Sequence, residues 1–314
     1  MDKEFDFYDK TSLKSYNLDQ SMRYQLNLLD TLDVYTRKHC ENVAILTCRL
    51  CEHLHCTKGV TEYCTMCAYL HDVGKLFIPS KVLQKPGKLT DEEYTIMKTH
   101  TTLGYEMCMK DLKLRPYAAG ALYHHEALNG SGYPQGLTKK DIPYEGQIIR
   151  VADEYDAIVS KRQYKSHIGI TDTLKILIEN TKPMKPINKS DALTTVVENT
   201  HLGKNNPIIV KKLLKVVIED VEYEIACIFD YVEELKNEIK RFEKINEYKI
   251  HMDKAKKEKD KNYYLEGMKM LLKENETIEN YPTLHEEYKE AYKTRKAIID
   301  NLYDEIKKIK KLKV

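Results

Sequence analysis

The sequence predicts an all-α fold, and three observations support this expectation. Apolar residues recur at helical spacing between short breaks that contain Gly or Pro, whereas strand signals are scarce. Thr90 followed by Glu93 forms a capping box, which marks a helix start. Residues 208–266 contain neither Gly nor Pro, so a long helix is expected there.

The first half of the chain is expected to form several short helices. An apolar stripe through Val43, Leu46, Leu50 and Leu54 predicts the first of them. The capping box at Thr90 opens a later one, and Ser190 or Asp191 can open another after the Pro-containing loop at 183–189. The expected architecture is therefore a bundle of short helices.

Eight cysteines include two CxxC pairs, Cys48/Cys51 and Cys64/Cys67. Their spacing resembles that of a structural zinc site. However, the first pair lies within the apolar helical stripe and the second within the run that enters His71. Buried cysteine behaves as a small hydrophobe, so helix packing is the preferred interpretation and a zinc site or disulfide the alternative.

The long helix after Pro207 carries a heptad pattern. Its apolar residues alternate steps of four and three over about four heptads, as in a coiled coil. They are Leu214, Ile218, Val221, Ile225, Ile228, Val232, Leu235, Ile239 and Phe242. Two outcomes fit the pattern: an antiparallel hairpin within the chain, or a homodimer through the 214–242 heptads.

The composition excludes several classes of protein. Charged residues make up 32% of the chain and nearly balance at a formal +2, which gives no reason to expect bulk nucleic acid or an anionic membrane as a partner. No apolar stretch approaches the ~18–20 residues that span a bilayer. The acidic, mixed N-terminus is unlike a signal peptide, so a cytoplasmic protein is expected.

A set of His and Asp residues in the first half predicts a metal site. Its members are His39, His71, Asp72, His100, His124, His125 and Asp153. Imidazole and carboxylate without thiolate suit iron, manganese or zinc, and the set is larger than one ion needs. A carboxylate bridges well because it has two oxygens, so Asp72 is the natural shared ligand of two ions. Such a pair of ions is suited to hydrolysis of a phosphate ester.

Several motifs resemble those of HD-domain metal-dependent phosphohydrolases, and in particular the HD-GYP subfamily. The segment His71-Asp72-Val73-Gly74-Lys75 matches the HDxGK motif, and residues 124–137 carry Gly132-Tyr133-Pro134. Further matching pieces are YTRKH at 35–39, MKTH at 97–100, VADEYDA at 151–157 and KRQYK at 161–165. The matching order and spacing extend from about residue 17 to residue 218.

The resemblance implies an HD-domain helical bundle with two metal ions, iron or manganese in typical members. His39, His71, Asp72 and Asp153 would hold one ion, and Asp72, His100, His124 and His125 the other. Some members bind a third ion through a Glu four residues before the first His. Tyr35 occupies that position here, which favours two ions. Ligand type alone permits several metals.

The resemblance also implies a cyclic di-GMP phosphodiesterase that forms pGpG, GMP or both. Asp72 and Lys75 would act in catalysis, and Lys75, Arg162 and Lys165 would contact the substrate. The loop at Gly132-Tyr133-Pro134 would lie near substrate access and dock to diguanylate-cyclase domains. Two alternatives remain: the same site acting on cyclic GMP-AMP or another small phosphate ester, and a metal-bound cyclic-dinucleotide sensor with little turnover.

The expected domains follow from these patterns. Residues 1–16 form an N-terminal tail, residues 17–222 the catalytic domain, and residues 223–314 a helical extension with a regulatory or assembly role.

Overall fold

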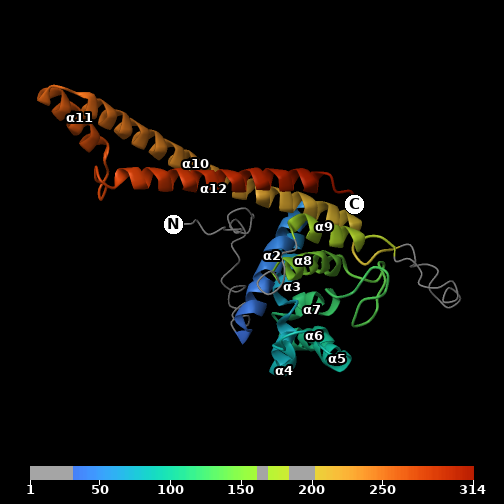
Figure 1. Ribbon diagram of the computed structural model, residues 1–314. Helices are drawn as coiled ribbons and strands as arrows, with labels where there is room; N and C mark the ends of the chain where they lie inside the picture. Colours follow the sequence, from blue (N-terminus) through green and yellow to red (C-terminus); the bar gives the residue numbers. More distant parts are fainter. Residues whose placement is uncertain (1–30, 161–168, 184–201) are drawn as a thin grey trace. The chain divides into compact units, whose positions relative to one another are not determined.

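The all-α expectation is confirmed by a computed structural model that describes residues 31–160, 169–183 and 202–314. Within these ranges every regular element is a helix, and the only β-type pairing is an isolated bridge between Asn129 and Thr138 (Figure 1). None of the described helices is both long and apolar enough to cross a membrane.

The described helices follow one another along the chain. In the first half they are α2 (Val34–His53), α3 (Lys58–Leu70), η4 (Val73–Phe77), α4 (Ser80–Leu83), α5 (Asp91–Lys98), α6 (His100–Lys110), η5 (Arg115–Tyr117), α7 (Ala118–Tyr123) and α8 (Tyr144–Ser160). Next come α9 (Ile170–Glu179), α10 (Pro207–Lys254), α11 (Glu258–Leu271) and α12 (Tyr281–Lys310).

The chain divides into two compact units, which we call the bundle and the hairpin. Of the described residues, the bundle comprises 31–160, 169–183, 202–218 and 309–314, and the hairpin comprises 219–308. Residues 1–3, like the rest of the expected tail at 1–16, lie outside the described residues. A catalytic domain at 17–222 that folds alone stays a prediction.

The bundle core consists of helices that are distant in the sequence. Buried apolar side chains of α2, α3, α8 and α9 pack together with those at the start of α10, including Leu50, Ile149, Leu177 and Leu213. Burial of each such side chain contributes about 1.5–3 kcal/mol before the cost of ordering it. This core holds in place the helix ends that carry the predicted metal ligands.

Local signals set several helix ends. The Asp33 side chain accepts hydrogen bonds from the amides of Tyr35 and Thr36 and caps α2. The capping box between Thr90 and Glu93 at the start of α5 is confirmed. The helix start expected at Ser190 or Asp191 lies outside the described residues.

The cysteines are free thiols, and most of them are buried. Cys40, Cys51, Cys64 and Cys67 belong to the bundle core. Among the described residues, neither CxxC pair appears in a cluster with metal-ligand geometry. The structure thus supports packing rather than a structural zinc site for these pairs.

In the hairpin, α10, α11 and α12 pack around an apolar cluster of their own. Helix α12 runs back along α10 (Figure 1). Phe242, Ile245, Met268 and Tyr281 are its buried members. Farther along, the guanidinium of Arg295 lies 5.4 Å from the ring centroid of Tyr231. Heptad positions such as Val221, Val232 and Leu235 are buried within the single chain. Of the two outcomes expected for the heptads, the structure shows the intramolecular hairpin.

Candidate metal centre

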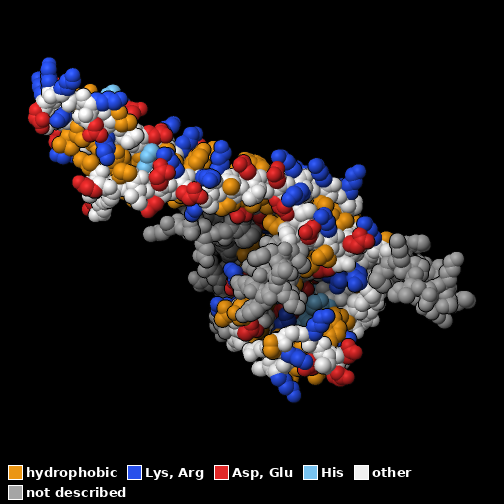
Figure 2. All heavy atoms as spheres, viewed as in Figure 1, with side chains coloured by type: hydrophobic (Ala, Val, Ile, Leu, Met, Phe, Trp, Pro, Cys, Tyr) orange, Lys and Arg blue, Asp and Glu red, His pale blue; other side chains and the backbone are white. Residues whose placement is uncertain are grey.

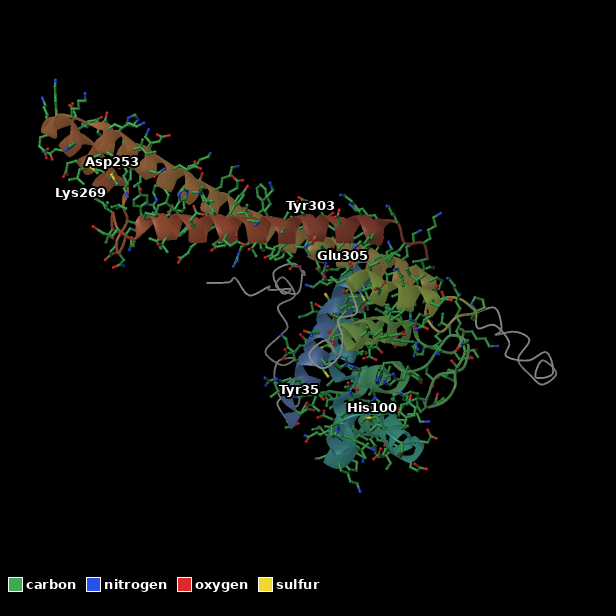
Figure 3. The ribbon with its side chains drawn as sticks, in the orientation of Figure 1. Tyr35, His100, Asp253, Lys269, Tyr303 and Glu305 are labelled. Carbon is green, nitrogen blue, oxygen red and sulfur yellow. The ribbon has the colours of Figure 1, made fainter. Side chains whose placement is uncertain are left out.

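The predicted ligands come from five helix segments that converge in the bundle. His39 lies on α2, His71 and Asp72 follow the last turn of α3, His100 begins α6, His124 and His125 follow α7, and Asp153 lies on α8. Figure 3 labels His100 at the start of α6 and Tyr35 near the start of α2. The structure therefore brings together residues more than 100 positions apart.

One close contact between backbones makes this convergence possible. A Cβ on Gly74 would lie 1.9 Å from the carbonyl oxygen of His100. Any larger residue would push α6 away from the turn after His71. Gly74 is therefore required by packing, because it brings His100 beside Asp72.

The imidazoles form two groups around Asp72. In one, ligand atoms of His39, His71 and Asp153 lie within 4.8 Å of one another; in the other, those of His100, His124 and His125 do so. Each group thus offers three nitrogen or oxygen ligand atoms within a few ångströms of one another, which is the donor set that a divalent ion needs.

Asp72 presents one carboxylate oxygen to each group. Its Oδ2 lies 3.3 Å from Nε2 of His71 and 3.6 Å from Nε2 of His39. Its Oδ1 lies 3.3 Å from Nε2 of His100 and 4.0 Å from Nε2 of His124. A side chain placed in this way has the geometry of a bridging ligand.

Hydrogen bonds on the far side of each ring aim the imidazoles at the centre. The Nδ1 atoms of His71, His100 and His124 donate to backbone carbonyl oxygens, at 2.6 Å to Ala68, 2.7 Å to Met97 and 3.0 Å to Gly120. These bonds require the Nδ1–H tautomer and leave the lone pair of Nε2 free. Metal-binding histidines are held in this manner.

The free lone pairs have few partners in the protein. Nε2 of His71 is buried without a hydrogen-bond partner, which is costly unless something fills the position. Nε2 of His100 and Nε2 of His124 lie 3.2 Å apart. Two ring nitrogens that both carry lone pairs repel each other at this distance, and a cation between them removes the repulsion. The residues therefore fit a metal site.

The two groups differ in protonation in the absence of metal. Burial lowers the pKa of His100 and lowers the pKa values of His124 and His125 further, with the neighbouring imidazoles contributing, so this group is neutral near pH 7. Burial also lowers the pKa of His39, but hydrogen bonds to Asp153 and Asp156 raise it overall to about 10. A metal ion must displace that proton.

Lys75 forms an ion pair with Asp72, at 2.5 Å between Nζ and Oδ2. Burial raises the pKa of Asp72, but the charge of Lys75 outweighs it and holds that pKa well below its usual range. Asp72 is therefore an anion at neutral pH, ready to act as a ligand. Lys75 lies on η4, with its ammonium directly beside the centre.

The structure also places Asp156, Asn42 and Cys40 near the centre, and the sequence had assigned none of them to the metal site. The Asp156 carboxylate accepts from Nδ1 of His39 at 2.6 Å and from Nδ2 of Asn42 at 3.1 Å, so it orients the first histidine. Asp156 follows Asp153 by three residues, which places both on one face of a helix and was the available signal. The Cys40 thiol forms a third cluster with His71 and Asp72. Burial raises the pKa of Cys40 well above its ordinary value.

The loop after the double histidine is attached firmly to the centre. The ring of Tyr133 stacks on that of His125, with centroids 4.6 Å apart. Glu126 is 1% exposed, and its carboxylate accepts from the amides of Gln135 at 2.7 Å and Leu137 at 2.8 Å. Sequence reasoning did not single out Glu126.

Not every predicted residue can be placed. Arg162 and Lys165, the expected substrate contacts, lie outside the described residues. Tyr35 is described, and its side chain is 73% exposed at the first turn of α2. It supplies no carboxylate at the position where a third ion would need one.

Comparison with known proteins gives consistent matches. The profile of the HD domain family matches residues 24–185. The chain is 43% identical over 144 residues to "Cyclic di-GMP phosphodiesterase" of Thermotoga maritima, which covers 45% of this chain and 39% of that protein. It is 45% identical over 116 residues to "Cyclic di-GMP phosphodiesterase response regulator RpfG" of Xanthomonas campestris, covering 36% of this chain and 31% of the relative.

A relative with another substrate in its name is also similar. The chain is 33% identical over 153 residues to "3'3'-cGAMP-specific phosphodiesterase 3" of Vibrio cholerae, covering 49% of this chain and 33% of the relative. The matched part is thus less than half the length of each of these three proteins. The resemblance to HD-domain phosphohydrolases of the HD-GYP type is confirmed.

Proposed function

The chain belongs to the HD domain family, and from this premise we propose that it is a two-metal phosphodiesterase. Its substrate would be cyclic di-GMP, and its product pGpG, GMP or both. The observation that carries the proposal is the position of Asp72, whose two carboxylate oxygens each face one group of histidines. The names of the two relatives above 40% identity support the choice of substrate.

In this proposal each histidine group holds one divalent ion. His39, His71 and Asp153 would hold the first, His100, His124 and His125 the second, and Asp72 both. Two such ions would polarise the phosphate and lower the pKa of a shared water. Iron and manganese are the proposed metals, because the donors are nitrogen and oxygen and Cys40, the thiol that lies near the centre among the described residues, has a raised pKa.

The protein's own side chains would perform the remaining tasks. The ammonium of Lys75 lowers the pKa of Asp72, so the carboxylate stays ionised. The centre therefore keeps its bridging anion at neutral pH. Lys75 carries the fixed positive charge closest to the bridging position, where it can stabilise charge that develops on the departing oxygen. Asp156 holds His39 in the ligating orientation. By resemblance, Arg162 and Lys165 would hold the substrate phosphates.

The proposed partners follow the same reasoning. The loop containing Gly132, Tyr133 and Pro134 would dock to diguanylate-cyclase domains. A homodimer through the 214–242 heptads would require a second copy to replace contacts that the hairpin makes within one chain. Light scattering of the full chain measures whether it dimerises.

Cyclic GMP-AMP is the second candidate substrate, because a relative at 33% identity is named for its 3'3' isomer. A pure sensor is the third candidate, and the location of Lys75 beside Asp72 argues against it. A protein that only binds the dinucleotide does not need both this lysine and a complete set of ligands for two ions.

One experiment tests the proposal. The protein is purified without oxygen, its bound metal is quantified, and conversion of cyclic di-GMP and cyclic GMP-AMP is followed by chromatography. We expect close to two metal ions per chain and faster conversion of cyclic di-GMP. Metal binding without conversion of either dinucleotide would favour the sensor, and a chain that binds no metal would overturn the proposal.

A further inference from the structure

Helix α5 presents an exposed aromatic side chain and a cation beside the metal centre. Tyr94 and Lys98 are four residues apart, so they lie on one face of the helix. The Tyr94 side chain is 48% exposed. The amine of Lys98 lies 5.2 Å from the centroid of the Tyr94 ring and 6.0 Å from that of Tyr133.

A continuous row of rings joins this face to the buried ligands. Tyr94 meets Tyr133 edge to face, with centroids 6.4 Å apart, and Tyr133 stacks on His125. The rings of His125 and His100 are in turn 5.2 Å apart. If a nucleotide placed its phosphate at His125, the rings of Tyr133 and Tyr94 would therefore lie within reach of its sugar and base.

The loop that carries Tyr133 is held by hydrogen bonds in which Tyr94 takes no part. Glu126 binds two loop amides, and the amide of Tyr133 donates to the carbonyl of His125 at 3.2 Å. A Cβ on Gly132 would lie 2.3 Å from the amide nitrogen of Ala127, so the loop lies directly against the double-histidine turn. These contacts attach the loop in addition to the edge-to-face contact with Tyr94, whose ring is half exposed and so remains accessible to a ligand.

We propose that Tyr94, Lys98 and Tyr133 form a purine-binding subsite at the entrance to the metal centre, selective for guanine. This inference rests on the proposed function and names the groups that would recognise the base. The Tyr94 ring offers a face for stacking, which every nucleobase accepts. The Lys98 ammonium can donate to O6 and N7 of guanine, whereas adenine presents an amino donor in place of O6.

The test compares a natural substrate with one that has no base. Steady-state kinetics are measured for cyclic di-GMP, cyclic di-AMP and bis(p-nitrophenyl) phosphate, using the metal-loaded full chain. Tyr94→Leu removes the ring while keeping an apolar side chain, and Tyr94→Phe keeps the ring. Ile96→Ala is the matched control, because Ile96 is an exposed apolar residue of the same helix.

Tyr94→Leu should raise the KM for cyclic di-GMP by about 5- to 150-fold, the range for loss of one stacked base. The kcat with bis(p-nitrophenyl) phosphate should not change, because loss of a binding contact raises KM and leaves kcat unaffected, and Tyr94→Phe and Ile96→Ala should resemble the unmodified protein. Lys98→Met should reduce the preference for cyclic di-GMP over cyclic di-AMP by about tenfold, as expected for loss of contacts to one base edge.

The outcomes separate this subsite from the proposed function. If the unmodified protein hydrolyses bis(p-nitrophenyl) phosphate but no cyclic dinucleotide, the proposed substrate is wrong. If it hydrolyses cyclic di-GMP and Tyr94→Leu leaves that KM unchanged, the subsite is wrong. Equal losses of kcat with both kinds of substrate would show that Tyr94 acts on the metal centre itself, and would also overturn the subsite.

Discussion

The bundle and the hairpin both contain clustered charged side chains, but they arrange them in opposite ways. In the hairpin, Arg241 uses all of its N–H donors. It bonds to Glu276 at 2.6 and 2.7 Å, to Glu238 at 2.7 and 3.0 Å, and to the carbonyl of Leu271 at 2.7 Å. Figure 2 shows Lys and Arg side chains interspersed with Asp and Glu along the rest of the hairpin surface.

The bundle instead directs lone pairs toward a shared space. Nε2 of His71 has no partner, and Nε2 atoms of His100 and His124 face each other. Charges that satisfy one another, as around Arg241, stabilise a fold. Charges and lone pairs that converge without satisfying one another indicate a ligand, because the protein alone leaves their interaction energy unfavourable.

The substitution expected to have the largest effect is Asp72→Ala. Because Asp72 faces both histidine groups, its loss should remove both ions and reduce hydrolysis at least about 1000-fold, or roughly 4 kcal/mol in activation free energy. Metal analysis and the chromatographic assay measure the two effects. Asp141→Ala is the control, since Asp141 is exposed and bonds to Thr138. Retention of both ions by Asp72→Ala would show that Asp72 does not bridge.

The next largest effect is expected in the hairpin. Arg241→Met should lower the free energy of unfolding by about 3 kcal/mol, because it leaves Glu238 and Glu276 without their main partner. Metal content should stay the same. Urea unfolding followed by circular dichroism measures the change. Lys244→Met serves as the control, because the pair of Lys244 with Glu247 is more than half exposed and contributes little. If Arg241→Met and Lys244→Met lowered the free energy of unfolding equally, the Arg241 network would be no more stabilising than an exposed ion pair.

A smaller effect is expected from Asp156→Ala. Loss of the carboxylate that orients His39 should weaken metal affinity about 10- to 100-fold, as for other residues that support a metal ligand. Competition with a chelator measures the affinity. Asp172→Ala, at an exposed ion pair with Lys175, should not alter it. Unchanged affinity in Asp156→Ala would mean that His39 is oriented by packing alone.

The smallest effect concerns pH. Salt bridges and hydrogen bonds to Lys273 and Arg241 lower the pKa values of Glu238 and Glu276, although burial by itself raises them. A lowered folded-state pKa adds stability above the ordinary carboxyl pKa and loses it as the pH falls through the folded-state pKa. The difference in unfolding free energy between the unmodified protein and Arg241→Met should therefore be about 1 kcal/mol smaller below about pH 4.5 than at pH 7.

That comparison is made on metal-free protein, so that loss of ions from the bundle does not contribute. A constant difference between the two proteins from pH 7 to pH 3 would show that the network stabilises the hairpin by packing and not by charge.

Sequence reasoning anticipated much of the candidate site. All seven predicted ligands lie at the convergence of the helices. They could be predicted because their residue types and their placement in adjacent pairs can be read directly from the sequence. Cys40 packs in the core, yet it also lies in a cluster with His71 and Asp72. Its second role depends on where α2 lies against the turn after α3, which the spacing of cysteines does not encode.

By itself the sequence determined the helical fold, the donor chemistry of the centre and the existence of a long heptad helix, because periodicity and side-chain chemistry act over a few residues. Only the tertiary structure decided which oxygen of Asp72 faces each group, and that the heptad stripe is buried by its own chain. Those outcomes depend on contacts between segments far apart in sequence. The close approach of Gly74 to His100 is one such contact, and no local pattern specifies it.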